Sequence, residues 1–221
     1  MTPKIIFDFD STFIQDETLD EIAKLKTKSS NLSEKAAKEI IHITNLAMDG
    51  SIEFSEALKK RIEILKLDKK DVIKISEQLK SRISPSFIKH KNKLKSNSHN
   101  IYIISGGFKE IIYEVVKDFG INKHQILANE FTYNDNQITG IISKNPLSSK
   151  DGKIKALEGL NLKSPIYIVG DGYTDFEMKH VKGVKGFICY IENINRPSVS
   201  KLADCIAKDL EETFRYIESN G

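Results

Sequence analysis

Four short apolar runs constrain the fold of this chain more than any other feature. They cover residues 5–9, 101–104, 166–169 and 186–190. Unbroken apolar runs of this length are typical of strands buried on both faces of a sheet, and the helical patterns between them favour parallel strands. The sequence therefore predicts an α/β fold built on a Rossmann-like parallel sheet.

The first two runs are separated by roughly ninety residues, far more than the one helix that a parallel crossover needs. Residues 14–83 carry four amphipathic helical patterns, which we expect to form a small bundle over the edge of the sheet. Asp16 is placed to cap the first of these helices, residues 49–50 to end the second and Asp68 to begin the fourth. A bundle in this position can act as a lid over a site.

These patterns predict two domains. We expect residues 1–13 and 84–221 to form the Rossmann-like catalytic core, and residues 14–83 to form a helical cap that sets substrate specificity. Pro85 marks the return of the chain from the cap to the core. Within the core, residues 125–142 contain two strand-like segments around the turn NDNQ, which predicts a β-hairpin at the edge of the sheet.

The composition excludes several classes of protein. Lys and Arg number 34 against 31 Asp and Glu, a balance that does not indicate a nucleic-acid-binding protein. No apolar run approaches the length that spans a membrane, and Asp8 and Asp10 interrupt the first one, which argues against a signal peptide. The two cysteines have no metal-type spacing, so we expect a cytoplasmic protein. The sequence does not decide whether the protein is a monomer or a homodimer. Arginine is scarce, at only four positions: Arg61, Arg82, Arg196 and Arg215.

The first apolar run ends in DFDST, which places Asp8 and Asp10 two residues apart at the carboxyl end of the expected strand. Because the backbone begins to turn there, both side chains can converge on one pocket. Two close carboxylates repel each other unless a cation or a shared proton relieves them, and this suits Mg²⁺-assisted chemistry on a phosphate. An isolated pair of this spacing is also common on protein surfaces.

A second acidic turn follows the third apolar run. Gly170 and Gly172 bracket Asp171, and Asp175 opens an expected helix, whose amino terminus it could cap. An ordinary Asp-Gly turn followed by a helix cap is the alternative interpretation. With DFDST upstream, a metal site is the better one.

Two further segments are candidates for binding an anion. Ser105, Gly106 and Gly107 follow the second apolar run and precede a helical stretch, where a hydroxyl and free backbone N–H groups can bind phosphate. An ordinary strand-to-helix turn is the alternative. Lys153 is a candidate for neutralising phosphate charge, and Lys150 competes with it for that role. We prefer Lys153, because apolar residues follow it at three, four and seven positions, as in a helix seated on the core.

Taken together and in this order, four segments resemble the haloacid dehalogenase phosphatase superfamily, and within it the phosphoserine phosphatases most. The resemblance runs over essentially the whole chain. The segments are DFDSTFIQDETLDEIA, NLAMDGSIEFSEALKKR, IYIISGGF and GDGYTD. It implies a Mg²⁺-dependent phosphatase that hydrolyses O-phosphoserine to serine and phosphate in serine biosynthesis.

The resemblance also assigns the nucleophile and the metal ligands. Asp8 would attack phosphorus and form an aspartyl-phosphate. Asp8, the backbone carbonyl of Asp10 and Asp171 would hold Mg²⁺, while Asp175 would orient a bound water or Lys153.

Proton transfer and phosphate binding fall to other residues. Asp10 would give a proton to the leaving alkoxide and later accept one from water, which requires a carboxyl pKa well above its usual value of about 3.9. Ser105 and the amide of Gly106 would bind phosphate oxygens, and Lys153 would neutralise charge in the transition state.

Substrate selectivity would come from the cap. By resemblance, Glu17 would pair with the substrate ammonium and Arg61 would grip its carboxylate, while Met48 and Phe54 would form an apolar wall. Thr174 stands where the family often carries asparagine, and its hydroxyl can still donate one hydrogen bond to the substrate.

The sequence leaves rival functions open. The chain could act on another small phosphomonoester or transfer phosphate to another hydroxy amino acid, and it does not distinguish L- from D-phosphoserine. A binding module that kept the fold and lost turnover is a further alternative. The presence of Asp10 argues against that module, because binding alone does not require a proton donor.

Overall fold

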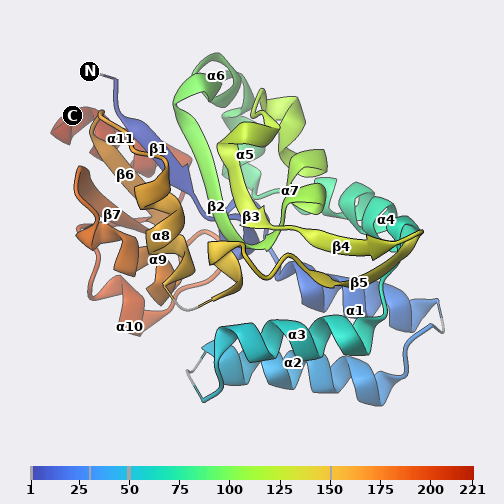
Figure 1. Cartoon of the computed structure of the whole chain (residues 1–221). Coiled ribbons are helices and arrows are strands. Elements are labelled where there is room, and N and C mark those ends of the chain that lie inside the picture. Colours follow the sequence, from blue (N-terminus) through green and yellow to red (C-terminus); the bar gives the residue numbers. More distant parts are fainter. Residues whose placement is uncertain (1, 30, 49–50, 150) are drawn as a thin grey trace.

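The computed structural model describes residues 2–29, 31–48, 51–149 and 151–221 (Figure 1). Its centre is a six-stranded sheet in the order β3-β2-β1-β6-β7-β8, and every neighbouring pair is parallel. The predicted Rossmann-like α/β fold is therefore confirmed. The strands are β1 (Lys4–Phe7), β2 (Ile101–Phe108), β3 (Ile126–Asn129), β6 (Ile166–Gly170), β7 (Val184–Tyr190) and β8 (Cys205–Ala207).

Strand β1 lies in the middle of this sheet. Ile5 pairs with Ile101 of β2 on one side and with Tyr167 of β6 on the other. The chain adds β2 and β3 on one side of β1 and then crosses back to add β6, β7 and β8 on the other side. This reversal is a topological switch point, where loops at the carboxyl ends of neighbouring strands separate and leave room for a ligand.

Helices cover both faces of the sheet. One face packs on α5 (Pro85–Lys89), α6 (Lys91–Ser96), α7 (Lys109–Val116) and α11 (Leu210–Asn220). The other face packs on α8 (Gly152–Gly159), α9 (Tyr173–Glu177) and α10 (Pro197–Ser200). Burial on both faces explains why the strands are apolar runs without alternation.

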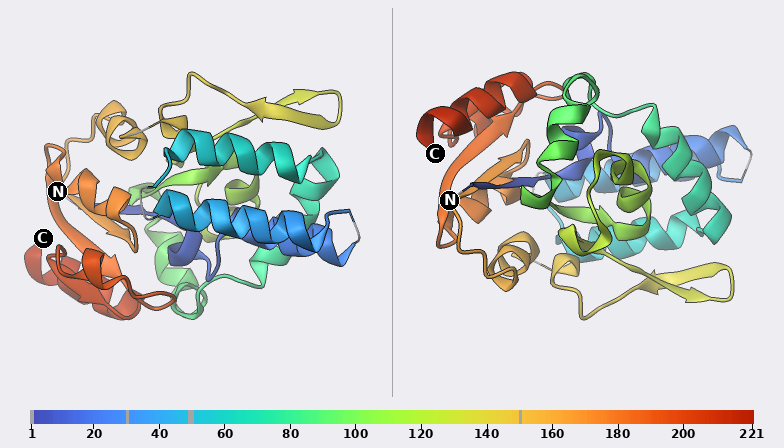
Figure 2. Two further views of the ribbon diagram at one scale, coloured as in Figure 1. Left: turned by 90° about the horizontal axis from the view of Figure 1, so that it is seen from below. Right: turned by 90° about the horizontal axis from the view of Figure 1, so that it is seen from above.

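The segment between β1 and β2 that holds the next four helices is the insert, residues 14–83. Its helices are α1 (Thr18–Lys28), α2 (Glu34–Met48), α3 (Phe54–Leu65) and α4 (Lys69–Lys80). In Figures 1 and 2, α2 and α3 run side by side at one end of the molecule. Their apolar residues join those of α7 in one continuous core, and α4 packs directly against α7. The four expected helices are present, whereas the boundaries of two separate domains stay a prediction.

The helix starts agree only in part with the sequence. Asp68 caps α4 as expected, accepting a hydrogen bond from the backbone N–H of Asp71 at 2.8 Å. The expectation that Asp16 caps α1 is wrong, because Glu17 precedes that helix and the Asp16 carboxylate pairs with Arg82 at 2.6 Å. The expected end of α2 at residues 49–50 lies outside the described residues.

The predicted hairpin is present, but its first strand is shorter than expected and it does not join the edge of the main sheet. Residues Ile126–Asn129 form β3 at the edge of the main sheet, because Ile126 and Ala128 are buried in the core. The hairpin consists of β4 (Phe131–Asn134) and β5 (Gln137–Ile141), which pair antiparallel in a separate sheet. It runs alongside α3 in Figures 1 and 2, and the Ile138 N–H donates to the Leu67 carbonyl at 3.0 Å.

Among the described residues, no helix combines the length and apolar character needed to cross a bilayer.

Candidate active site

Asp8 follows β1 directly and is buried, with 8% of its surface exposed. Its Oδ1 accepts a hydrogen bond from the Phe9 N–H at 2.7 Å, and its own N–H donates to the Val169 carbonyl of β6 at 2.9 Å. The following turn closes when the Ile14 N–H donates to the Phe9 carbonyl, with Ser11 in the left-handed region at φ 55°. These contacts fix the position of the Asp8 carboxylate at the switch point.

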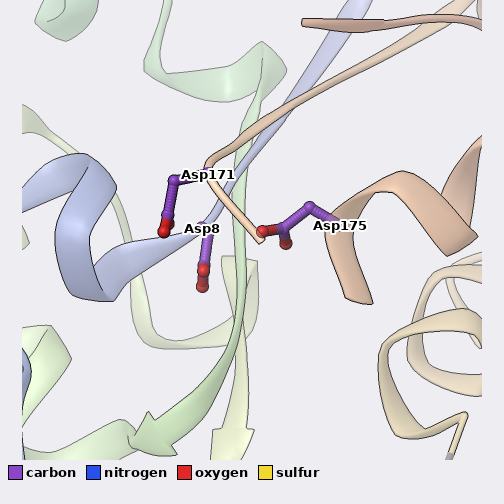
Figure 3. A group of neighbouring side chains, drawn as sticks. All are labelled: Asp8, Asp171 and Asp175. Atoms are coloured by element: carbon purple, nitrogen blue, oxygen red, sulfur yellow. The ribbon is translucent and has the colours of Figure 1, made fainter. Parts of the chain in front are cut away.

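Three carboxylates gather beside this turn. Asp8, Asp171 and Asp175 each offer an oxygen that lies within 4.8 Å of the other two (Figure 3). Asp171 follows β6, the strand that pairs with β1, and Asp175 belongs to the first turn of α9. The structure thus brings Asp8 of DFDST together with both aspartates of GDGYTD, more than 150 residues away in the sequence.

Asp175 is fully buried, and both of its oxygens have partners. Its Oδ1 pairs with the Lys153 Nζ at 2.8 Å, and its Oδ2 accepts from the Gly172 N–H at 3.0 Å. A Cβ added at Gly170 would lie 2.4 Å from the Asp175 carboxylate, so this position requires glycine. These contacts suit the predicted orienting role of Asp175 better than direct ligation of a metal.

Lys153 connects the acidic turns. Its Nζ lies 3.0 Å from Asp8 Oδ1 and 2.8 Å from Asp175 Oδ1. Burial alone would lower the pKa of the ammonium, but the attraction of Asp175 and Asp8 outweighs it and raises the pKa above its ordinary value. Lys153 is therefore charged and lies between the Asp8 and Asp175 carboxylates. The competing Lys150 lies outside the described residues.

Asp171 has a cationic partner that the sequence interpretation missed. Arg196 donates from Nε to Asp171 Oδ2 at 2.9 Å, and its Nη2 lies 3.8 Å from Glu17 Oε1. The Thr12 hydroxyl donates to the other oxygen, Asp171 Oδ1, at 3.2 Å. Two signals in the sequence could have indicated Arg196: arginine is scarce, and this residue follows β7 at the same edge of the sheet.

Asp10 points to a different part of the site. Its Oδ1 accepts from the Thr18 N–H at 3.0 Å and from the Thr18 hydroxyl. Its Oδ2 faces Gly107, where an added Cβ would lie 3.6 Å away. Thr18 is the first residue of α1, so the insert supplies the hydrogen bonds that orient Asp10.

The expected phosphate-binding segment is an extension of β2 rather than a loop. The strand continues through Ser105 and Gly106 to Phe108, and α7 begins at Lys109. The Ser105 hydroxyl is buried and accepts from the Gly107 N–H at 3.0 Å. Asn129, a further residue that the sequence interpretation missed, donates to the Gly106 carbonyl at 2.9 Å. Because the Ser105 oxygen accepts here, and its hydrogen has no acceptor among the described residues, the hydroxyl can donate to a ligand.

All of the expected selectivity residues except Thr174 come from the insert. Glu17 accepts a hydrogen bond from the Ser11 hydroxyl at 2.9 Å. Arg61 is buried, with 6% of its surface exposed, and donates to the Thr44 hydroxyl at 3.2 Å. Asp20 attracts its charge most strongly, followed by Glu17 and Asp10. Thr174 is exposed at the start of α9. The side chains of Met48 and Phe54 lie outside the described part of the chain.

The acids of the site outnumber the cations that pair with them, Lys153 and Arg196. Burial, with repulsion by Asp8, raises the pKa of Asp10 to about 7, although Thr18 opposes the shift. Burial and repulsion by Asp10 raise the pKa of Glu17 to about 8. Burial and repulsion by Asp8 also raise the pKa of Asp175, to about 8, and that of Asp171. Lys153 and Arg196 do not neutralise this cluster, whose oxygen donors fit a hard divalent cation.

Comparisons with known proteins identify relatives of this chain. The family model of the haloacid dehalogenase-like hydrolases matches residues 5–180. The phosphoserine phosphatase of Methanocaldococcus jannaschii is 31% identical over 97% of this chain and 97% of its own length. The chloroplastic phosphoserine phosphatase of Arabidopsis thaliana is also 31% identical, over 97% of this chain and 71% of that protein.

A solved structure agrees in fold as well. A phosphoserine phosphohydrolase-like protein from Francisella tularensis superposes with a TM-score of 0.83 at 30% identity, covering 98% of this chain and all of that one. The family match covers well over half of the chain, and the relatives match along nearly all of it. This chain therefore belongs to the haloacid dehalogenase-like hydrolase family, among its phosphoserine phosphatase relatives.

Proposed function

We propose that this chain is a Mg²⁺-dependent phosphoserine phosphatase, which releases serine and phosphate through an aspartyl-phosphate and serves serine biosynthesis. The observation that carries the proposal is the meeting of Asp8, Asp171 and Asp175 with Lys153 at the switch point of the sheet. The names of the 31% identical relatives support the choice of substrate.

Asp8, Asp171 and the backbone carbonyl of Asp10 would hold the Mg²⁺. The ion supplies positive charge to the phosphate and to the carboxylates around it when bound. Asp175 leaves the coordination to these residues, because its own oxygens are used by Lys153 and Gly172. It keeps Lys153 in position instead.

In the first chemical step, a carboxylate oxygen of Asp8 forms a bond to phosphorus while the bond from phosphorus to the serine oxygen breaks. Lys153, the Ser105 hydroxyl and the Gly106 N–H stabilise the negative charge on the transferring phosphate oxygens. Fixed donors of this kind, already in place before the reaction, lower the barrier without a reorganisation cost.

Asp10 carries the proton. Both contacts from Thr18 use its Oδ1, so the proton resides on Oδ2, which faces Gly107 and the phosphate-binding segment. Oδ2 gives that proton to the departing serine oxygen and then takes one from the water that hydrolyses the aspartyl-phosphate. The raised pKa of Asp10, about 7, keeps enough of the acid protonated near neutral pH.

Selectivity for phosphoserine comes from the insert. Glu17 would pair with the substrate ammonium and Arg61 with its carboxylate, with Thr174 as a further hydrogen-bond donor. Binding an ammonium beside Glu17 would also offset the burial and the repulsion that raise its pKa. Met48 and Phe54 would complete an apolar wall that excludes water.

The test is phosphate release from a panel of small phosphomonoesters, with and without Mg²⁺, for the wild type, Glu17→Ala and Arg61→Ala. We expect activity that depends on Mg²⁺, a preference for phosphoserine, and selective loss of that preference in both variants. Wild-type protein that ignores phosphoserine but cleaves other esters would refute the substrate. Adding acceptor alcohols to the same assay shows whether phosphate is transferred to a hydroxyl instead of to water.

A further inference from the structure

The chain crosses between the sheet and the insert twice, and the two crossings lie side by side. The Gln15 N–H donates to the Arg82 carbonyl at 2.8 Å, and the Ser84 N–H donates to the Phe13 carbonyl at 3.0 Å. Ile14 and Ile83 form an antiparallel bridge between these bonds. If α1–α4 move relative to the sheet, the backbone has to bend at these two crossings.

Asn193 reaches both crossings from a distant part of the sequence. Its Nδ2 lies 3.1 Å from the Ser11 carbonyl and 3.2 Å from the Ile14 carbonyl, on the first crossing. The same nitrogen lies 2.7 Å from the Ser84 hydroxyl oxygen, on the second crossing, and 3.3 Å from the Thr12 carbonyl. An amide NH₂ has two hydrogens, so these acceptors share them.

The loop that carries Asn193 is attached on both sides of this residue. Before it, Glu192 accepts from the Ser86 N–H at 3.0 Å, at the start of α5. After it, Arg196 pairs with Asp171 at 2.9 Å and lies 3.8 Å from Glu17. The loop of residues 192–196 therefore connects the crossings to the acidic cluster.

We propose that Asn193 is a positioning residue that holds the two crossings together and so sets the place of the insert over the site. It contacts no substrate. The insert supplies Glu17, Arg61 and Thr18, and Thr18 orients Asp10. If the two crossings separate, these three insert residues shift relative to the residues of the core. The consequence for phosphoserine rests on the proposed function, whereas the consequence for the crossings does not.

The test compares Asn193→Asp with Asn195→Asp. Both changes replace an amide NH₂ with an oxygen, two residues apart in one loop. Asn195 is exposed and uses its oxygen to accept from Ser200, which aspartate preserves. In Asn193→Asp, by contrast, a carboxylate oxygen replaces the donor and faces three carbonyl oxygens. A third variant, Asn193→Ser, keeps one donor and serves if the aspartate variant does not fold.

The first readout is hydrogen exchange at the amides of Gln15 and Ser84, which needs no activity. We expect exchange at both amides to accelerate about tenfold or more in Asn193→Asp, less in Asn193→Ser, and not at all in Asn195→Asp. Exchange in β2 stays at the wild-type rate. Unchanged exchange at the two amides, or an equal acceleration throughout the chain, overturns the proposal.

The second readout compares phosphoserine with p-nitrophenyl phosphate, which lacks the ammonium and carboxylate. We expect kcat/KM to fall about tenfold more for phosphoserine than for p-nitrophenyl phosphate in Asn193→Asp. Equal losses on both substrates would mean that Asn193 only stabilises the fold. If the wild type shows no preference for phosphoserine, the proposed function fails, and the hydrogen exchange still decides the role of Asn193.

Discussion

Asp8 and Asp10 are two residues apart, yet their surroundings prepare them for different tasks. Asp8 accepts a backbone N–H and pairs with Lys153, and these two contacts hold its carboxylate in the place from which a nucleophile can attack. Asp10 is desolvated and repelled by Asp8, which raises its pKa to about 7 and favours the protonated form that an acid needs. The division of roles follows from these environments rather than from the residue type.

Replacing Asp10 by Asn should separate the two chemical steps. We expect phosphoserine turnover to fall about 10²–10⁴-fold, because the serine alkoxide needs a proton in order to leave. p-Nitrophenolate leaves without one, so its first step should survive while hydrolysis of the aspartyl-phosphate stays slow. Stopped-flow absorbance should then show a burst of about one nitrophenolate per enzyme molecule. Equal losses on both substrates, with no burst, would contradict the assignment.

Replacing Arg61 by Lys should affect substrate binding. The guanidinium donates to Thr44 and to the Ala57 carbonyl, and lysine cannot keep those bonds while gripping a carboxylate at two points. We expect KM for phosphoserine to rise at least about tenfold, with little change for p-nitrophenyl phosphate. Arg215→Lys, an exposed change in α11, is the matched control. A rise of the same size in both variants would disprove the assignment.

At the scale of elements, the start of α8 positions Lys153. Gly152 is the first residue of this helix, and a Cβ there would lie 2.4 Å from the Pro146 carbonyl oxygen. Asn145 fixes the same turn, since its side chain accepts from the Leu147 N–H at 3.0 Å and donates to the Ala128 carbonyl at 2.7 Å. The close contact between α8 and this turn therefore fixes the position of Lys153.

Gly152→Ala should therefore lower the free energy of unfolding by about 1–3 kcal/mol, because backbone atoms have to move apart. Gly159→Ala is the control in the same helix, where an added Cβ would meet no described atom within 4 Å other than its chain neighbours and the adjacent helix backbone. That change should be neutral or stabilise by up to about 1 kcal/mol. Urea unfolding measures the change in the free energy of unfolding for both variants. Similar changes in the two would show that the turn can move away from α8 at little cost.

At the scale of the whole molecule, the acidic cluster couples stability to pH and to metal. Asp10, Glu17 and Asp175 have pKa values of about 7 to 8 in the folded chain. These lie above the ordinary values of about 4 that the unfolded chain restores. Between about pH 4 and about pH 8 the folded state binds more protons than the unfolded state, so the free energy of unfolding of the metal-free protein falls as the pH rises.

The melting temperature in the presence of EDTA should therefore decrease from about pH 5 to about pH 8. Mg²⁺ competes with the protons for the cluster, so the increase in melting temperature that it causes should be larger at the higher pH. Glu17→Gln removes one of the titrating acids and should flatten the decrease. Differential scanning calorimetry at both pH values, with and without Mg²⁺, checks this. Stability of the metal-free protein that rises with pH would contradict it.

Local sequence determined most of the elements of this protein. Unbroken apolar runs predicted the parallel strands at 101–104 and 166–169, and amphipathic periods predicted the four insert helices. Residues that end a strand lie at one edge of a parallel sheet, so Asp8, Ser105 and Asp171 could be assigned to a common site. The strand and helix predictions are confirmed because each depends on neighbours within a few residues.

Long-range contacts decided the rest. Whether Ile126–Asn129 joins the hairpin or the main sheet depends on burial against the core, which the strand pattern alone does not show. Arg196 and Asn193 acquire their partners only when the loop after β7 folds against segments some 25 and 180 residues away. Charged and amide side chains in a loop follow no periodic sequence pattern, so tertiary packing and not local sequence decides which residues they contact.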